Sequence, residues 1–169
     1  MGNFSLWEGC LIGKMICPSA EKVQDDLQTM SERIAELKEK ESEIQSAFSL
    51  PAWTPSEVPK NRSGSYRRQE DAIVAVQDIR KRIAYLEQCI ADYIDVIRNA
   101  PEGVVRGRER MVYLLERRYL DRCQWGIIAA GLFQGEPDYF EKVPAYLRKT
   151  HRLHNAACKS IWQLWSVKR

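Results

Sequence analysis

Two stretches of the chain carry the same helical repeat, and this repeat limits the possible folds more than any other feature. In the first stretch, apolar residues recur in alternating steps of four and three from Val23 to Phe48, with Glu41 as the polar exception. In the second, the same steps run from Ala72 to Ile97. Apolar residues at this spacing form one stripe along a helix, as in a coiled-coil seam. No window shows convincing strand-like alternation, so we expect an all-α protein.

The segment between the two stripes, LPAWTPSEVPKNRSGS, is unsuited to a continuous helix. It contains Pro51, Pro55 and Pro59, and then Gly64, which together favour a loop. We therefore predict a loop over residues 49–67 within a coiled-coil-like antiparallel helical hairpin over residues 19–100. Each stripe has to be buried, and pairing with a second chain remains an alternative. Because one hairpin buries little apolar area for its length, we expect a homo-oligomer.

The first 18 residues do not predict a defined element. The segment MGNFSLWEGCLIGKMICPSA is moderately apolar, yet it contains Glu8 and Lys14 and lacks a basic start. It is therefore a poor signal peptide and too short to span a bilayer. We interpret residues 1–18 as a poorly defined N-terminal extension and expect no membrane association. The five cysteines show neither CxxC nor a disulfide spacing, which favours a reducing, cytoplasmic location.

Positive charge is concentrated in the C-terminal part of the chain. Residues 101–169 contain 13 Lys and Arg against 7 Asp and Glu, a balance of +6, whereas the whole chain carries +3. The first 100 residues are therefore mildly acidic. This asymmetry predicts a module for a polyanion at residues 101–169, next to a module with another role.

We predict three helices in this basic module, with a helix-turn-helix as the arrangement of the last two. The first helix spans residues 104–121 and carries on one face Val104, Val105, Arg108, Met111, Val112, Leu115 and Tyr119. The second runs from about Gln124 to Phe133 and turns Trp125, Ile128, Ala129 and Leu132 inward. A small residue such as Ala129 lets the next helix cross closely at a steep angle. The connection QGEPDYFEKVPA is longer than a tight turn, and we expect Tyr139, Phe140 and Val143 to cover the junction.

The last helix, expected from Pro144 to about Trp165, separates an apolar stripe from a basic face. Its inward residues are Tyr146, Thr150, Leu153, Ala157, Ile161 and Leu164. The candidate DNA-binding residues are Arg148, Lys149, His151, Arg152, Asn155 and Lys159, together with Arg122 before the second helix. Cations in the N-terminal half of a helix oppose its dipole, and a bound polyanion would resolve that conflict. In a helix-turn-helix this half enters the major groove, where Arg binds guanine and Lys or His contacts phosphates. A merely solvated face is the alternative.

The runs ERRYLDRCQWGIIAAGL and YLRKTHRLHNAACKSI resemble the C-terminal region of phage late-transcription regulators of the RinA and ArpU kind, whose fold is similar to region 4 of bacterial sigma factors. The matching residues are Arg118, Tyr119, Trp125, Ile128, Ala129, Tyr146, Arg148, Arg152, His154 and Ala157. The resemblance covers about residues 20–164. It implies a sequence-specific regulator of phage or prophage late genes, with double-stranded DNA as partner and RNA polymerase as a further candidate. The long connection and Gly126 depart from the family pattern.

Two other functions fit the same features. A small terminase-like packaging protein also combines a helix-turn-helix with helical oligomerisation, and a coiled-coil adaptor would leave the basic face solvated. His151, His154, Cys158 and Cys123 form a rival set of zinc ligands, although they lack closely paired spacing. The chain has no phosphate-binding glycine loop and no nucleophile motif. We therefore expect no enzymatic activity, no cofactor and no metal.

Overall fold

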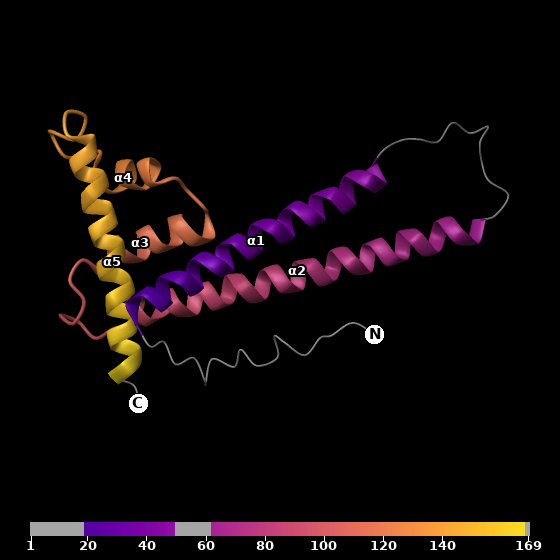
Figure 1. Ribbon diagram of the computed structural model, residues 1–169, viewed down its shortest axis with the longest axis horizontal. Coiled ribbons are helices and arrows are strands. Elements are labelled where there is room, and N and C mark those ends of the chain that lie inside the picture. Colours follow the sequence, from indigo (N-terminus) through magenta and orange to yellow (C-terminus); the bar gives the residue numbers. More distant parts are fainter. Residues whose placement is uncertain (1–18, 50–61, 168–169) are drawn as a thin grey trace.

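The structure is a computed structural model that describes residues 19–49 and 62–167 (Figure 1). Every regular element in these ranges is helical, as predicted, and none of them contains a strand. The elements are α1 (Ala20–Ser49), α2 (Arg62–Arg98), α3 (Arg108–Leu115), a π-helical turn η2 (Glu116–Leu120), α4 (Trp125–Phe133) and α5 (Val143–Val167). The N-terminal extension, residues 1–18, lies outside the described residues.

The helices α1 and α2 lie side by side and run in opposite directions (Figure 1). The Tyr93 hydroxyl donates to Asp26 at 3.1 Å near one end of the pair, and Arg80 Nε donates to Glu41 at 2.7 Å further along. The residues buried between and around the two helices belong mostly to the predicted stripes. They are Val23, Leu27, Ile34 and Leu37 of α1, with Ile83, Leu86, Ile90, Tyr93 and Ile97 of α2.

The C-terminal bound predicted for the connection between these helices is wrong, whereas its start agrees with the end of α1. Helix α1 continues to Ser49 and α2 already begins at Arg62, so Gly64 lies inside a helix. A single glycine costs a helix only about 1 kcal/mol relative to alanine, and the following residues are mostly good helix formers. The three prolines of the predicted loop lie within residues 50–61, outside the described residues.

The helix predicted over residues 104–121 is shorter and less regular than expected. Two glycines with left-handed backbone, Gly103 (φ 81°) and Gly107 (φ 71°), shape the turns after α2, and α3 begins only after the second. Val104 of the predicted face is therefore 58% exposed. After α3 the helix continues as the wider π-helical turn η2. Tyr119 in this turn is nevertheless buried, as predicted.

Helix α5 crosses the end of the α1 and α2 pair where α1 begins and α2 ends (Figure 1). One core joins the elements, and it includes Val23 of α1, Ile90 of α2, Leu114 of α3, Ile128 of α4 and Ile161 of α5. The predicted boundary between residues 19–100 and 101–169 is thus spanned by a shared core, and the division into two modules stays a prediction. None of the described helices combines the length and apolarity needed to cross a bilayer.

Candidate nucleic-acid interface

Helix α5 has a buried face and a basic face, divided largely as the sequence predicts, with Leu153 and Leu164 of the predicted inward set only partly buried. Thr150, Ala157 and Ile161 are fully buried, and Tyr146 is nearly so. The opposite side carries four exposed residues in steps of four, three and four, which we call the α5 stripe: Arg148, Arg152, Asn155 and Lys159. Among the described residues, no carboxylate lies within ion-pair distance of the three cations of the stripe. The stripe therefore presents charge that the described part of the chain leaves uncompensated.

Other arginines near α5 are engaged in structural contacts. Arg98 pairs with Glu116 across the junction of α2 and η2, and Arg117 bonds to Asp121 at 2.9 Å. Arg108 donates to carbonyl oxygens at the end of α2 and in the turn that follows it. These side chains cap and connect helices, so their charge is already used within the fold. The contrast separates the α5 stripe from these three arginines, whereas Arg106 and Arg122 are also exposed and form no ion pair with a described carboxylate.

Two further predicted residues, Lys149 and His151, flank the α5 stripe and are exposed. The Lys149 ammonium lies 4.1 Å from the centre of the Tyr146 ring. The His151 ring lies 4.4 Å from the Trp125 ring, centre to centre, and the Arg118 guanidinium lies 4.7 Å from the same Trp125 centre. Aromatic contacts thus restrain both flanking side chains beside the stripe.

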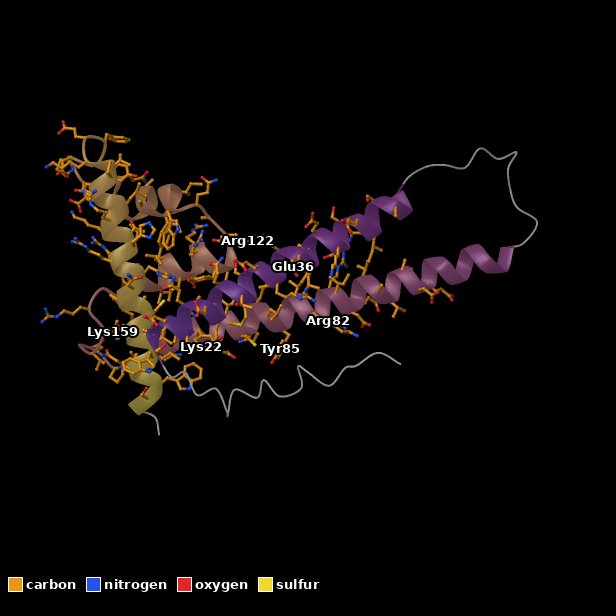
Figure 2. The ribbon with its side chains drawn as sticks, in the orientation of Figure 1. Lys22, Glu36, Arg82, Tyr85, Arg122 and Lys159 are labelled. Carbon is orange, nitrogen blue, oxygen red and sulfur yellow. The ribbon has the colours of Figure 1, made fainter. Side chains whose placement is uncertain are left out.

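Arg122, the remaining predicted residue, lies apart from the α5 stripe. It is exposed, follows η2, and faces Gln28 and Glu32 of α1 across a small cleft. Figure 2 shows Arg122 and Lys159 well separated, with Arg122 beside α1. The structure therefore brings six predicted residues together on α5 and leaves the seventh elsewhere.

His154 is buried, a fact that its spacing in the sequence did not reveal. Its Nε2 lies 2.7 Å from the Tyr119 hydroxyl and 3.7 Å from Cys158 Sγ, and its Nδ1 lies 3.4 Å from Asn155 Oδ1. Burial lowers the pKa of His154 and raises the pKa of Cys158 to about 12. Both side chains are therefore neutral near pH 7 and join η2 to α5. A buried tyrosine 35 positions earlier in the chain is the partner that spacing alone could not identify.

The rival zinc ligands do not form a metal site in the described part of the chain. No group of three or more His, Cys, Asp or Glu side chains there is arranged to hold a metal ion. Instead, the His151 ring contacts the Trp125 ring in a tilted arrangement, and His154 contacts Tyr119 and Cys158. These histidines are used in packing and hydrogen bonding.

Small residues let α4 approach its neighbours closely. Ala129 and Ile128 beside it are both fully buried, and the crossing of α5 at Ala129 stays a prediction. On another side of α4, a Cβ added at Gly131 would lie 2.0 Å from the Tyr113 hydroxyl of α3. Helix α4 is thus positioned against both α3 and α5.

The connection between α4 and α5 is held by its own contacts. Asp138 accepts hydrogen bonds from Lys142 Nζ at 2.8 Å and from the Tyr146 hydroxyl at 2.5 Å. These bonds lower the pKa of Asp138 to about 2. Tyr139 is buried against Phe133 and Tyr146, in a cluster separate from the main core.

Phe140 does not cover the junction, contrary to prediction. It is 83% exposed, because Tyr139 takes the inward position and Phe140 follows it on the outer side of the turn. Its ring remains in edge contact with Tyr139 at 5.3 Å between centres. The connection is therefore ordered by one aromatic residue and leaves the next one in solvent.

Comparison with known proteins adds nothing to this description. No family model, no curated protein and no solved structure matches the chain significantly. The resemblance to phage late-transcription regulators therefore stays a prediction from the sequence motifs, and any functional assignment depends on the geometry of α4 and α5.

Proposed function

We propose that the protein is a sequence-specific DNA-binding regulator of phage or prophage late genes, in which α4 and α5 act as a helix-turn-helix. The observation that supports this proposal is the α5 stripe. Arg148, Arg152 and Lys159 are exposed on a helix whose opposite face is in the core, and no described carboxylate neutralises them. A phosphate backbone supplies the missing negative charge.

In this proposal the N-terminal half of α5 enters the major groove. Arg148 and Arg152 lie one turn apart and bind base edges, where a bidentate arginine contributes about 1–3 kcal/mol of discrimination for guanine. Asn155 is suited to adenine in the same way. Lys149 and Lys159 contact phosphates, which positions the helix without selecting a sequence.

The experiment first selects bound sequences from a random duplex pool and then titrates the best site and a scrambled duplex at several salt concentrations. Arg152→Ala is expected to lose about 1–3 kcal/mol on the selected site and the preference at one base position. Lys159→Ala is expected to weaken both duplexes alike and to lower the salt slope by about one. Lys40→Ala is the matched control, because it removes an exposed cation from the far part of α1.

Circular dichroism establishes that each variant is folded. If Arg152→Ala and Lys159→Ala bind both duplexes as wild type does, the stripe is only a solvated face and the proposal fails. That result would favour the coiled-coil adaptor, for which no salt-sensitive DNA affinity is expected. RNA polymerase remains a proposed partner, to be tested once a promoter sequence is selected.

The proposal includes self-association, supported by apolar residues in the outer part of α2. Ile73 and Val74 are 58% and 56% exposed there. Ile83, in contrast, is 7% exposed and belongs to the shared core, so substitution at that position tests folding rather than assembly. We place the contact with a second copy at these two exposed apolar side chains.

Sedimentation of wild type and of the double variant Ile73→Lys, Val74→Lys tests this part. The variant is expected to sediment as a smaller species with unchanged helical content. A wild type that stays monomeric at high concentration would overturn the assembly role. A large ring would instead favour the second candidate, a small terminase-like packaging protein, for which the same exposed pair on α2 supplies the contact.

A further inference from the structure

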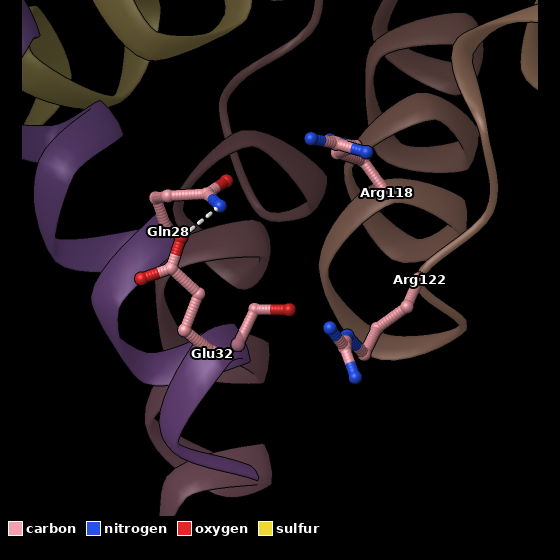
Figure 3. A pocket seen from close by; sticks show the side chains of 5 residues that line it. Gln28, Glu32, Arg118 and Arg122 are labelled. Carbon is pink, nitrogen blue, oxygen red and sulfur yellow. Dashed lines mark hydrogen bonds between the residues drawn. The ribbon is translucent and has the colours of Figure 1, made fainter. Parts of the chain in front are cut away.

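A small cleft lies where the first half of α1 meets the end of η2 (Figure 3). It is lined by Gln28, Ser31 and Glu32 of α1, by Arg118 of η2, and by Arg122 in the turn that follows. Figure 3 shows the guanidinium groups of Arg118 and Arg122 pointing across the cleft toward α1. The cleft is separate from the α5 stripe and is not used in the function proposed above.

The cleft has more positive than negative charge. Arg118 is held in place by its stacking over Trp125 and by a hydrogen bond from Nη1 to the Cys123 carbonyl at 3.4 Å. Arg122 forms no ion pair with a described carboxylate. The one acid in the lining, Glu32, accepts a hydrogen bond from Gln28 Nε2 at 2.5 Å. Two guanidinium groups therefore face one carboxylate, which is already engaged.

Two further observations describe how the lining of the cleft is fixed. Arg122 has φ 56°, and it is the one non-glycine residue with a left-handed backbone in the described ranges. Such a conformation is uncommon for a residue with a long side chain and persists where the surroundings impose it. Here the Cys123 amide, next in the chain, donates to the Arg117 carbonyl at 2.8 Å. The second observation is Ser31, whose side chain lines the cleft although the residue is only 5% exposed.

We propose that this cleft binds a phosphate group. Guanidinium groups present several N–H donors in a planar fork that matches phosphate oxygens, and two of them compensate a dianion. The Ser31 hydroxyl adds a neutral donor on the α1 side. Glu32 lies in the same lining and repels the anion, so it lowers the affinity for phosphate. Replacing Glu32 with a neutral residue should therefore raise that affinity.

The phosphate has two conceivable sources, a small phosphate-containing molecule and the backbone of a nucleic acid. The position of the cleft favours the first, because a duplex seated on the α5 stripe lies on another side of the molecule from Arg122 (Figure 2). The negative charge of Glu32 also repels a nucleic-acid backbone, with its many phosphates, more strongly than it repels a single phosphate group. Both sources share the same chemistry at Arg118, Arg122 and Ser31.

The test is a calorimetric titration of inorganic phosphate into the full chain, in chloride buffer of constant ionic strength. Arg122→Gly is the decisive variant, because glycine adopts the left-handed backbone without strain and the whole side chain, with its guanidinium, is removed. We expect it to keep or raise the melting temperature and to weaken phosphate binding about tenfold or more, as expected for losing a charge-assisted bond. Glu32→Gln is expected to strengthen binding several-fold, because it removes the repulsion.

Arg106→Ala is the matched control, since Arg106 is an exposed arginine outside the cleft, and it should leave the affinity unchanged. The inference is overturned if wild type binds no phosphate, or if Arg122→Gly and Glu32→Gln both bind phosphate as wild type does.

Repeating the titration with saturating duplex of the selected sequence distinguishes the sources. Unchanged phosphate binding is expected and supports a small ligand. Loss of the phosphate signal would assign the cleft to the nucleic-acid backbone and overturn the small-ligand source. The first titration needs no DNA, so its outcome is independent of the function proposed for α5.

Discussion

Removing the Tyr119 hydroxyl tests how the buried polar contacts join η2 to α5. Tyr119 is 2% exposed and His154 is 3% exposed, and their hydrogen bond of 2.7 Å links residues from two elements. The contact between His154 Nδ1 and Asn155 Oδ1 fits the tautomer in which Nδ1 carries the proton and donates to Asn155. In that tautomer Nε2 is an acceptor, and the Tyr119 hydroxyl donates to it. Tyr119→Phe keeps the ring and leaves this acceptor without its main partner.

The expected cost follows from the burial of that acceptor. A buried acceptor that loses its donor costs about 1–3 kcal/mol. The thiol of Cys158, 3.7 Å from the same Nε2, is a weak donor that offsets part of the loss. We therefore expect Tyr119→Phe to lower the free energy of unfolding by about 1–2 kcal/mol. For a chain of this size that corresponds to a fall of about 2–8 °C in melting temperature.

The assay is urea denaturation followed by circular dichroism at pH 7, for Tyr119→Phe, His154→Leu and the double variant. Removing both polar partners leaves no orphaned group in the pair, so the double variant should cost less than the sum of the single variants. Strict additivity would show that the two side chains do not interact. An unchanged midpoint in Tyr119→Phe would show that water or Cys158 fully replaces the hydroxyl. Either result refutes the reasoning.

The remaining predictions concern acid stability and the core. Burial lowers the pKa of His154 from 6.5, so its neutral form contributes stability above pH 6.5 that is lost as the pH falls toward the folded pKa; His154→Leu should lack this loss in melting curves between pH 7 and 5. Asp138, whose pKa is lowered from 3.8 to about 2 by bonds from Lys142 and Tyr146, contributes stability above pH 3.8 that disappears as the pH falls to about 2. Asp138→Asn should therefore flatten the melting temperature across that window, and an unchanged acid profile would contradict it. Ile161→Ala, at a fully buried position, should lower the free energy of unfolding by about 2–5 kcal/mol in urea titrations, and a cost below about 1 kcal/mol would show that the site is not tightly packed.

Hydrophobic spacing predicted the buried faces of the long helices because burial requires apolar residues on one side of each helix. The inward residues of α5 are a clear case, since Tyr146, Thr150, Ala157 and Ile161 are all buried. The same spacing placed the basic residues of α5 on the exposed side. Helix period thus placed Arg148, Arg152, Asn155 and Lys159 outward, where they are exposed, but it did not show that His154 is buried.

Backbone geometry at single residues was harder to predict from the sequence. Gly64 was expected to help end a loop but lies inside α2, whereas Gly107 ends a turn through its left-handed φ of 71°. A glycine permits both outcomes, and the tertiary contacts decide between them. Likewise Tyr139 and Phe140 are both large aromatic residues, and only the path of the turn determined that Tyr139 is buried and Phe140 exposed.

The placement of Arg122 depended on a long-range contact that no local pattern encodes. Its left-handed backbone and the packing of η2 against α1 direct it to the cleft with Glu32, away from the α5 stripe. A basic residue just before α4 was a reasonable candidate for a phosphate contact on DNA. The contact between two segments about ninety positions apart in the chain explains why that expectation needed the structure.

The continuity of α5 has a mechanical consequence for the proposed function. Its N-terminal half carries Arg148 and Arg152, and its C-terminal half packs against the base of the α1 and α2 pair, where the Trp165 and Tyr93 rings lie 5.3 Å apart between centres. Because one uninterrupted helix makes both sets of contacts, the direction of α1 and α2 is fixed relative to the stripe. If the stripe binds DNA as proposed, the long helices project from the duplex at a set angle. A second copy joined through Ile73 and Val74 would then fix the spacing between two DNA sites, and the selected sequences should contain paired half-sites at one preferred separation.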